Sequence, residues 1–316
     1  MNRARLLSTL LDLIQIDSPS KREAAVASYC KDELEKLGCK VSIDKTSAAT
    51  GSDTGNLVAT LPGSLPGKLY FSAHMDTVSP GEGIVPVITD GIIRSKGDTI
   101  LGGDDKVGIA VIIEMIKTLK EEARPHPTIV VLLSVCEEIS LLGAMSIDAS
   151  DFRGEPCFVL DGDGKPGVVV IGSPFHYEFA ATFTGRAAHA GIEPEKGISA
   201  IRLAAKAVLG MELGRLDDQT TANVGTIAGG NAINIIADTC VLTGEFRVLD
   251  ETKVETMKAQ LASAMYAATE EMGGQVALEW TGEYAGFKIP EQDSLVQLVL
   301  REAKKLGLET KTMVSG

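Results

Sequence analysis

The sequence predicts an α/β protein with a largely parallel or mixed sheet, into which a smaller α+β domain is inserted. Two observations support this: strands alternate with helices over residues 1–174, and over 175–286 the order becomes β-α-β-β-α-β, the split order of ferredoxin-like domains. A helix expected at 291–306 should return to the first domain. We therefore assign 1–174 and 287–316 to one domain and 175–286 to the insertion.

The elements of the first domain follow from hydrophobic spacing. Apolar residues at helical intervals predict helices at 6–16, 20–37, 107–120 and 140–147, the second of them capped by Ser20. Apolar runs between turn residues predict strands at 41–43, 56–61, 68–73, 128–135 and 157–161. The continuous apolar run 129–133 is typical of a strand buried on both faces, and Cys136 and Cys157 are expected to be buried with such strands.

The inserted region shows a different alternation of polar and apolar residues. Strands are predicted at 177–184, 223–228, 239–248 and 276–283, and helices at 197–213 and 252–272. The strand at 177–184 alternates like one with a single exposed face.

Composition narrows the functional class. The formal net charge of −13 argues against binding to nucleic acid or to an anionic membrane, since phosphate contacts need Lys and Arg. No apolar run approaches 18 residues, and the N-terminus lacks the features of a secretory signal, so neither a membrane span nor export is predicted. Five Cys without a CxxC indicate reduced thiols in the cytoplasm.

Four segments rich in metal-ligating side chains stand where predicted strands should end. They are 74–76 (His-Met-Asp), 102–106 (Gly-Gly-Asp-Asp-Lys), 136–138 (Cys-Glu-Glu) and 160–162 (Leu-Asp-Gly). Carboxylates gathered at strand ends repel each other unless positive charge lies between them, and a pair of divalent ions is the usual answer. The sequence therefore predicts a two-metal hydrolase.

The side chains can be divided between two zinc ions. Zinc in a catalytic site takes His nitrogen and carboxylate oxygen. His74 and Asp161 can hold one ion and Glu138 the other, while Asp104 can bridge them because a carboxylate has two oxygens.

Two acids of the same segments have no place among these ligands. Asp76 lies two residues from His74 on the same face of a strand, where it can accept the other imidazole N–H. Glu137 can take a proton from the attacking water and give it to the leaving amine.

Each motif has an ordinary explanation when taken alone. Adjacent acids often begin a helix or lie in a solvated turn, and 161–164 reads as a simple turn. An EF-hand is disfavoured because no Glu closes the twelve-residue spacing. A Ser or Cys hydrolase is also disfavoured, since no GxSxG occurs and Cys136 is expected to be buried beside acids. The joint occurrence of the motifs favours metal.

The inserted domain has candidates of its own. His189 lies in a loop of small residues and can reach a developing oxyanion, although a lone loop His is usually only solvated. Asn231, Asn234 and Arg247 are candidates for binding substrate, and Arg247 can clamp a carboxylate in bidentate fashion. An ion pair between Arg247 and a surface acid is an equal alternative.

These motifs together resemble the dizinc metallopeptidases of clan MH. The runs SAHMDTV (72–78), LGGDDKVG (101–108), Glu137-Glu138 and Asp161-Gly162 carry the resemblance, and the HMDTV and GGDDK forms look most like the peptidase T branch. The resemblance covers nearly the whole chain.

The resemblance implies a role for each candidate. The implied metal ligands are His74, Asp104 as bridge, Glu138 and Asp161, with Glu137 as general base and Asp76 as the partner of the His74 ring. Zinc is the implied metal, with Co²⁺ or Mn²⁺ as alternatives, and a cis peptide is implied between Asp104 and Asp105.

The inserted domain resembles the dimerisation lid of this family. In a homodimer His189 would serve the active site of the other subunit, and Asn231, Asn234 and Arg247 would face the substrate.

One feature departs from the family pattern. The family has a further His ligand after a Gly-Gly-Ser-Asp-type loop, whereas His occurs here only at 74, 126, 176 and 189, and the sequence stops at 316. We expect the sequence to be truncated at its C-terminus, to retain fewer than two zinc ions per chain, and to be catalytically impaired.

Three functions remain open. The favoured one is a cytoplasmic, metal-dependent aminopeptidase acting on tripeptides. The second is a related amidohydrolase that removes an acyl group or a carboxy-terminal residue. The third is a non-catalytic assembly protein with a vestigial metal site.

Overall fold

The structure is a computed structural model that describes residues 1–148, 150, 152, 154–162 and 164–315. The chain forms two units, Met1–Gly162 and Asp163–Gly316.

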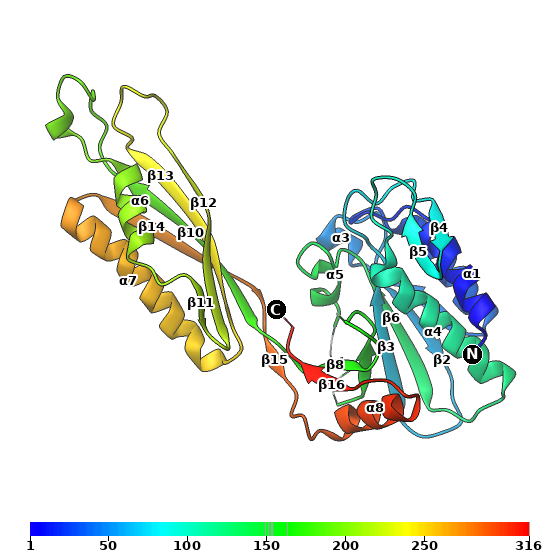
Figure 1. Cartoon of the computed structure of the whole chain (residues 1–316). Coiled ribbons are helices and arrows are strands. Elements are labelled where there is room, and N and C mark those ends of the chain that lie inside the picture. The colour runs from blue at the N-terminus through cyan, green and yellow to red at the C-terminus, as the bar shows by residue number, and fades with distance from the viewer. Residues whose placement is uncertain (149, 151, 153, 163, 316) are drawn as a thin grey trace. The chain divides into compact units, whose positions relative to one another are not determined.

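A five-stranded mixed sheet organises the first unit (Figure 1). Its strand order is β1-β2-β6-β3-β7, with β1/β2 and β2/β6 antiparallel and β3/β6 and β3/β7 parallel. The bounds are β1 Lys40–Ile43, β2 Leu57–Leu61, β3 Lys68–His74, β6 Thr128–Ser134 and β7 Cys157–Val159. The predicted α/β class with a mixed sheet is confirmed.

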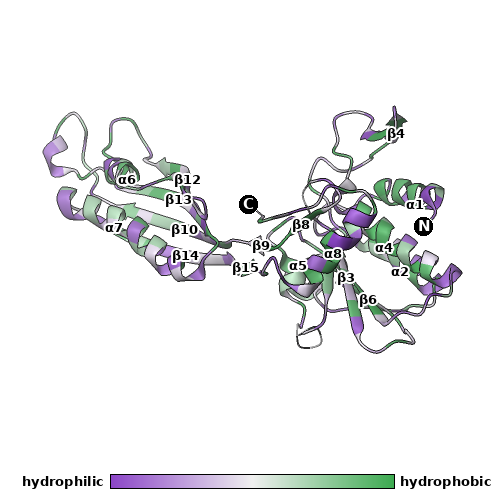
Figure 2. Ribbon diagram, turned by 60° about the horizontal axis from the view of Figure 1, so that its bottom comes forward, coloured by the Kyte–Doolittle hydropathy of each residue, from purple (hydrophilic) through white to green (hydrophobic). Residues whose placement is uncertain are grey.

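Helices cover this sheet because alternate strand residues are apolar. Leu57, Val131 and Leu133 point to the face on which the long helices pack, and Tyr70, Val130 and Leu132 form a smaller cluster on the other face. The helices are α1 Arg3–Ile14, α2 Ala24–Lys36 and α4 Gly103–Glu121, with short α3 Ser47–Thr50 and α5 Leu142–Met145. Figure 2 shows the hydrophobic residues that run along α4.

The parallel strands determine where the candidate residues gather. β3 ends at His74, β6 ends at Ser134, and β7 ends at Val159. Since parallel strands end at the same edge of a sheet, the residues that follow them lie together there.

Two local predictions for this unit are wrong. Ser20 does not cap the second helix, which begins at Ala24; the Ser20 hydroxyl instead donates to Asp76 Oδ2 at 2.7 Å. Cys157 is exposed because β7 is an edge strand of the sheet.

A hairpin was missed at β4 Pro86–Thr89 and β5 Ile92–Ser95. Its Asp90-Gly91 turn, with positive φ at both residues, is a strong hairpin signal that the sequence carries.

The larger part of the second unit is an antiparallel sheet covered by two helices (Figure 1). The order β11-β12-β13-β10-β14 includes one strand, β11, that was not predicted. Phe183, Leu203, Leu242, Phe246 and Leu261 lie in its core. The elements are β10 Phe175–Thr184, α6 Ala200–Leu209, β11 Gly214–Asp217, β12 Thr220–Gly229, β13 Thr239–Val248, α7 Val254–Met272 and β14 Gln275–Tyr284, with 3₁₀ turns η2 Pro194–Lys196 and η3 Glu251–Lys253.

Short strands on either side of this α+β region pair with each other. β8 Val168–Val170 is parallel to β16 Lys311–Met313, and β9 Gly172–Ser173 is antiparallel to β15 Phe287–Lys288; α8 Ser294–Lys305 lies between β15 and β16 in sequence. The assignment of 1–174 and 287–316 to a single domain stays a prediction.

An ion pair between Arg5 on α1 and the buried Glu114 on α4 links the N-terminal segment to α4. Glu114, which is 1% exposed, accepts hydrogen bonds from Asn2 N (2.6 Å), Arg5 Nε (2.6 Å) and Thr118 Oγ1 (3.1 Å). Hydrogen bonding to Arg5 lowers the pKa of Glu114 from 4.5 to about 2. The ionised carboxylate therefore stabilises the fold above its unfolded pKa, and this contribution is lost as the pH falls toward 2.

We expect Glu114→Ala to lower the free energy of unfolding at pH 7 by roughly 1–3 kcal/mol, because its donors lose a charged acceptor. Denaturant unfolding of both proteins from pH 7 to pH 2 measures the difference, which should shrink as the solution becomes acidic. A constant difference would contradict the ionic origin of the effect.

Candidate metal centre

The imidazole of His74 lies at the centre of a cluster of carboxylates. The ring is buried at the end of β3, and its Nε2 is 2.9 Å from Asp104 Oδ1, 3.9 Å from Glu137 Oε2 and 3.9 Å from Asp161 Oδ1. Three elements supply these acids: the start of α4, the turn after β6 and the segment after β7.

All four predicted ligands belong to this cluster. Ligand atoms lie within 4.8 Å of one another in two groups, His74 with Asp104 and Glu138, and His74 with Glu137 and Asp161. Two ligands on opposite sides of one Zn²⁺ would be about 4.4 Å apart, since each zinc bond is about 2.0–2.2 Å. A His nitrogen among carboxylate oxygens at this spacing fits a divalent metal. Glu137, predicted as a base, lies close enough to be a ligand as well.

The acids of the cluster are unfavourable as bare anions. Burial raises the pKa of Asp161 to about 7, with the charges of Asp104 and Glu137 adding to the shift and His74 opposing it. Burial also raises the pKa of Glu137 and of Glu138, again against the effect of His74. Bound cations would favour the ionised forms, as the sequence argument expected.

The pKa of His74 is raised as well, which for a histidine favours the charged form. Burial alone lowers its pKa, but hydrogen bonding to Asp76 and the charges of Asp161 and Glu137, together with Asp104, raise it to about 10. The surrounding acids therefore favour the protonated, positively charged form of the His74 ring.

The backbone at Asp104 has a special conformation. The Asp104–Asp105 peptide is cis, as the family resemblance implied, and Asp105 is buried although sequence reasoning gave it no role. Asp105 Oδ1 accepts the N–H of Gly108 at 3.0 Å, and a Cβ at Gly108 would lie 2.4 Å from that oxygen. The Asp-x-x-Gly spacing at the start of α4 is the sequence signal for this contact.

Asp76 has more contacts than the predicted one. His74 Nδ1 is 2.8 Å from the backbone carbonyl of Asp76 and 3.5 Å from its carboxylate Oδ1. The carboxylate accepts the backbone N–H groups of Glu137 (2.9 Å) and Glu138 (3.1 Å). Asp76 therefore supports both the ring and the turn that carries the two glutamates.

The candidates of the second unit divide into two groups. His189 and Asn234 are exposed in adjacent loops, joined by a hydrogen bond from Ala190 N to Asn234 O at 3.0 Å, and Asn231 lies three residues before Asn234 in the same loop. Arg247 lies near the far end of β13, where its guanidinium is 3.1 Å from Glu245 Oε2.

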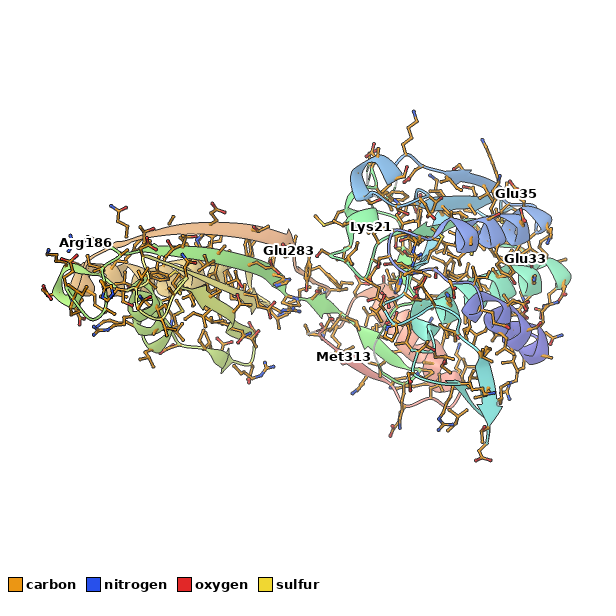
Figure 3. The ribbon with its side chains drawn as sticks, turned by 90° about the horizontal axis from the view of Figure 1, so that it is seen from above. Lys21, Glu33, Glu35, Arg186, Glu283 and Met313 are labelled. Atoms are coloured by element: carbon orange, nitrogen blue, oxygen red, sulfur yellow. The ribbon has the colours of Figure 1, made fainter. Side chains whose placement is uncertain are left out.

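The length of the sheet separates these groups. Thr239, at the start of β13, and Arg247 are eight residues apart on the strand, which corresponds to about 26 Å at 3.3 Å per residue. Figure 3 labels one residue at each end of this sheet. Arg186 lies at the end with the His189 loop. Glu283 lies at the Arg247 end, because its neighbour Tyr284 is paired with His176, which is paired with Arg247 on its other side.

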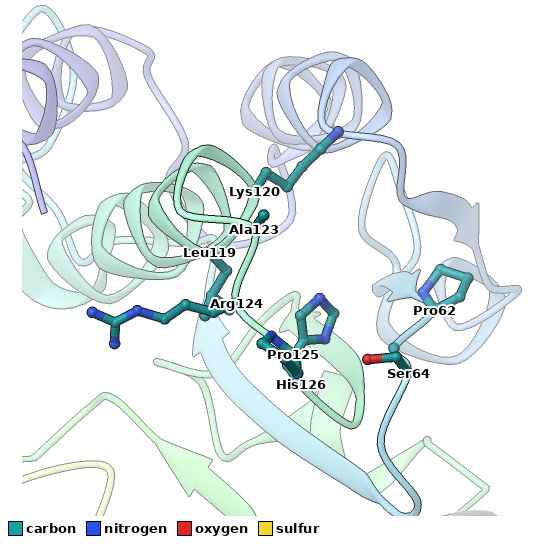
Figure 4. A pocket seen from close by; sticks show the side chains of 9 residues that line it. Pro62, Ser64, Leu119, Lys120, Ala123, Arg124, Pro125 and His126 are labelled. Atoms are coloured by element: carbon teal, nitrogen blue, oxygen red, sulfur yellow. The ribbon is translucent and has the colours of Figure 1, made fainter.

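A surface hollow of about 490 Å³ lies elsewhere, at the C-terminal end of α4 (Figure 4). Lys120, Arg124 and His126 are among the residues that line it, and none of the clustered acids does. The hollow therefore lacks the metal-ligating acids of the cluster.

Among the described helices, none is both long and apolar enough to cross a membrane.

Comparison with known proteins identifies two matching families. Residues 176–272 match the profile of the M20 peptidase dimerisation domain, and residues 56–153 match that of peptidase family M28.

Three relatives match along the whole chain. The YqjE protein of Bacillus subtilis is 41% identical over 317 residues, covering 100% of this chain and 85% of its own length. The aminopeptidase PepT of Bacillus cereus is 42% identical with a TM-score of 0.95, and a Staphylococcus aureus tripeptidase is 35% identical with a TM-score of 0.96; each alignment covers 100% of this chain and 85% of the other. The cluster of His74 and carboxylates lies at the edge of the sheet. Together with it, the sequence identity to these relatives over the whole chain shows that the chain belongs to the peptidase T-like branch of the M20 metallopeptidases.

Proposed function

We propose that this metallopeptidase is a tripeptide aminopeptidase, which removes the first residue of short peptides. The observation that carries the proposal is the convergence of Asp104, Glu137, Glu138 and Asp161 on the buried His74 ring. The similar proteins described as an aminopeptidase and a tripeptidase support the choice of substrate.

The proposed ligands divide as the sequence suggested. His74 and Asp161 would hold one ion, Glu138 the other, and Asp104 both. We propose zinc, for which a His nitrogen with carboxylate oxygens is a familiar donor set, while Co²⁺ and Mn²⁺ can use the same ligands. When bound, the ions supply Lewis acidity toward the scissile carbonyl.

Glu137 is the proposed general base. Its carboxylate is partly buried and lies 3.9 Å from His74 Nε2. Burial raises its pKa, which brings a carboxylate closer to the pH at which it must exchange protons. Glu137 would take a proton from the attacking water and then deliver it to the nitrogen of the leaving amine.

The separation of the lid candidates supports a homodimer. An extended tripeptide spans about 10 Å, less than half the distance between the His189 and Arg247 ends of the sheet. The two ends of one lid would therefore serve different active sites. We propose that His189 stabilises the oxyanion in the other subunit, that Asn231 and Asn234 hydrogen-bond to substrate, and that Arg247 binds a substrate carboxylate.

A cytoplasmic location is also proposed. The five Cys residues are all free thiols, a pattern typical of reducing compartments.

Substrate end groups distinguish aminopeptidase from deacylase or carboxypeptidase activity. We expect acetylation of a tripeptide's amino group to lower kcat/KM by more than about 100-fold, because an aminopeptidase site must recognise the free amine and acetylation leaves the groups that would do so unpaired. Amidation of the carboxyl group should have a smaller effect. Steady-state kinetics of the metal-loaded, full-length protein on the free, acetylated and amidated forms measures both changes.

The other outcomes identify the alternatives. Faster hydrolysis of the acetylated peptide would favour a deacylase or carboxypeptidase. No hydrolysis of any form by metal-loaded protein would favour the assembly protein.

A further inference from the structure

We propose that Glu23 is a positioning residue of the active site, a role that rests on the proposed function of Glu137 and Glu138. Glu23 lies in the segment between α1 and α2, more than 100 residues before Glu137 and Glu138 in the sequence, and is fully buried. Together with Asp76 it holds the backbone of the turn at residues 136–138 through buried carboxylates.

The turn offers three successive N–H groups. It follows β6, and Cys136 has a φ of +52°, in the left-handed region that residues other than glycine rarely adopt. The N–H of Cys136 donates to Glu23 Oε1 at 3.0 Å, that of Glu137 to Asp76 Oδ1 at 2.9 Å, and that of Glu138 to Asp76 Oδ2 at 3.1 Å. Two carboxylates thus accept all three N–H groups, and hydrogen bonds to charged acceptors are the stronger kind.

Glu23 is itself held from two sides. Its Oε1 also accepts the N–H of Lys21 at 2.9 Å and lies 3.5 Å from Cys136 Sγ, while its Oε2 accepts the hydroxyl of Ser52 at 2.5 Å. The position of the carboxylate is therefore set by the α1–α2 segment and the loop at Ser52, and it transmits that position to Cys136.

The consequence concerns the residues that follow Cys136. The proposed base and a proposed metal ligand leave the same turn, so a shift of Cys136 moves both. Displacements of about 1 Å at an active site can cost about 100-fold in rate. Asp76 also contacts the His74 ring through its carbonyl, whereas the hydrogen bonds of the Glu23 carboxylate reach Lys21, Ser52 and Cys136. Changes at Glu23 therefore report on the turn.

The test compares Glu23→Ala and Glu23→Gln in the metal-loaded, full-length protein. We expect Glu23→Ala to lower kcat on a tripeptide by roughly 10- to 100-fold with KM changed less than about threefold, the range found for residues that orient ligands. Glu23→Gln should retain most of the activity, since its amide oxygen can accept the Cys136 N–H and its NH₂ can donate to Ser52. Glu114→Ala is the matched control: it also removes a buried carboxylate of this unit, and it should lower stability but leave kcat unchanged.

A spectrum of cobalt-substituted protein separates this proposal from the proposed function. Glu23→Ala should change the visible bands of bound Co²⁺, because Glu138 is displaced, and Glu114→Ala should not. If the parent protein hydrolyses no peptide, the aminopeptidase proposal fails while the cobalt comparison still tests Glu23. Wild-type kcat and bands in Glu23→Ala, or an equal loss of kcat in Glu114→Ala, would overturn the positioning role.

A second pair of variants covers the case in which Glu23→Ala does not fold. Glu23→Asp shortens the side chain, and Ser52→Ala removes the donor to Oε2. Both should lower kcat severalfold and alter the cobalt bands in folded protein. Unchanged kcat and bands in both would overturn the role equally.

Discussion

Glu137→Gln is expected to lower kcat on a tripeptide by about 1,000-fold while the bound metal content stays the same. Glutamine keeps the size of the side chain but cannot accept a proton from water, and general base catalysis contributes about 10²- to 10⁴-fold. Steady-state kinetics together with metal analysis of the dialysed protein measures both quantities.

Glu35→Gln is the control for this change. It makes the same substitution at an exposed position on α2, and its turnover should equal that of the parent. Full activity in Glu137→Gln would remove Glu137 from the mechanism. Loss of metal along with activity would make Glu137 a ligand, which its closeness to His74 and Asp161 allows.

Asp161→Asn is expected to change stability in opposite directions with and without metal. Without metal the variant should be more stable at pH 8, by roughly 1–3 kcal/mol, because a charge that is unfavourably buried and repelled by Asp104 and Glu137 is gone. With metal the parent should be the more stable, since a ligand at 1,000 times its Kd contributes about 4 kcal/mol to the native state and the variant loses most of this.

The pH dependence follows from the raised pKa of Asp161, about 7 in the folded protein. An acid with a raised folded pKa costs no stability while it is protonated in both states. The cost begins above its unfolded pKa near 4 and is complete above about 7. The advantage of the metal-free variant should therefore be full at pH 8 and absent below about pH 4.

Denaturant unfolding in chelator and in excess zinc, at several pH values, measures these differences. Asp90→Asn, in the β4–β5 turn, is the control because it makes the same change at an exposed site. Its effect should stay within about 0.5 kcal/mol under all conditions. A metal-free Asp161→Asn that is less stable than the parent would show that the buried Asp161 charge does not destabilise the metal-free fold.

Much of the fold was predictable because its longer elements carry their own periodicity. The strands β2, β3, β6 and β13 and the helix α7 were predicted to within a few residues. The strands β8, β11 and β16 were missed, since they are three or four residues long and become strands only through a partner. The β4–β5 hairpin was missed, although its Asp90-Gly91 turn is a pattern that predicts a hairpin.

The gathering of His74, Glu137 and Asp161 was predictable for a topological reason. Their motifs follow apolar runs directly, and parallel strands of one sheet end at one edge, so order along the chain implied closeness in space. The sequence motifs also indicated the family, and the resemblance to that family implied the cis peptide at Asp104. The metal and catalytic roles of these residues stay predictions.

The amino-acid order alone thus determined the fold class, the family and the acids that meet around one histidine, because each has a local pattern. Only the tertiary structure decided which carboxylates hold the turn that carries Glu137, and that Arg247 lies beside Glu245. The first of these contacts joins residues 113 positions apart. No periodicity encodes such a pairing, since it depends on how separate elements pack and on which buried N–H groups then need an acceptor.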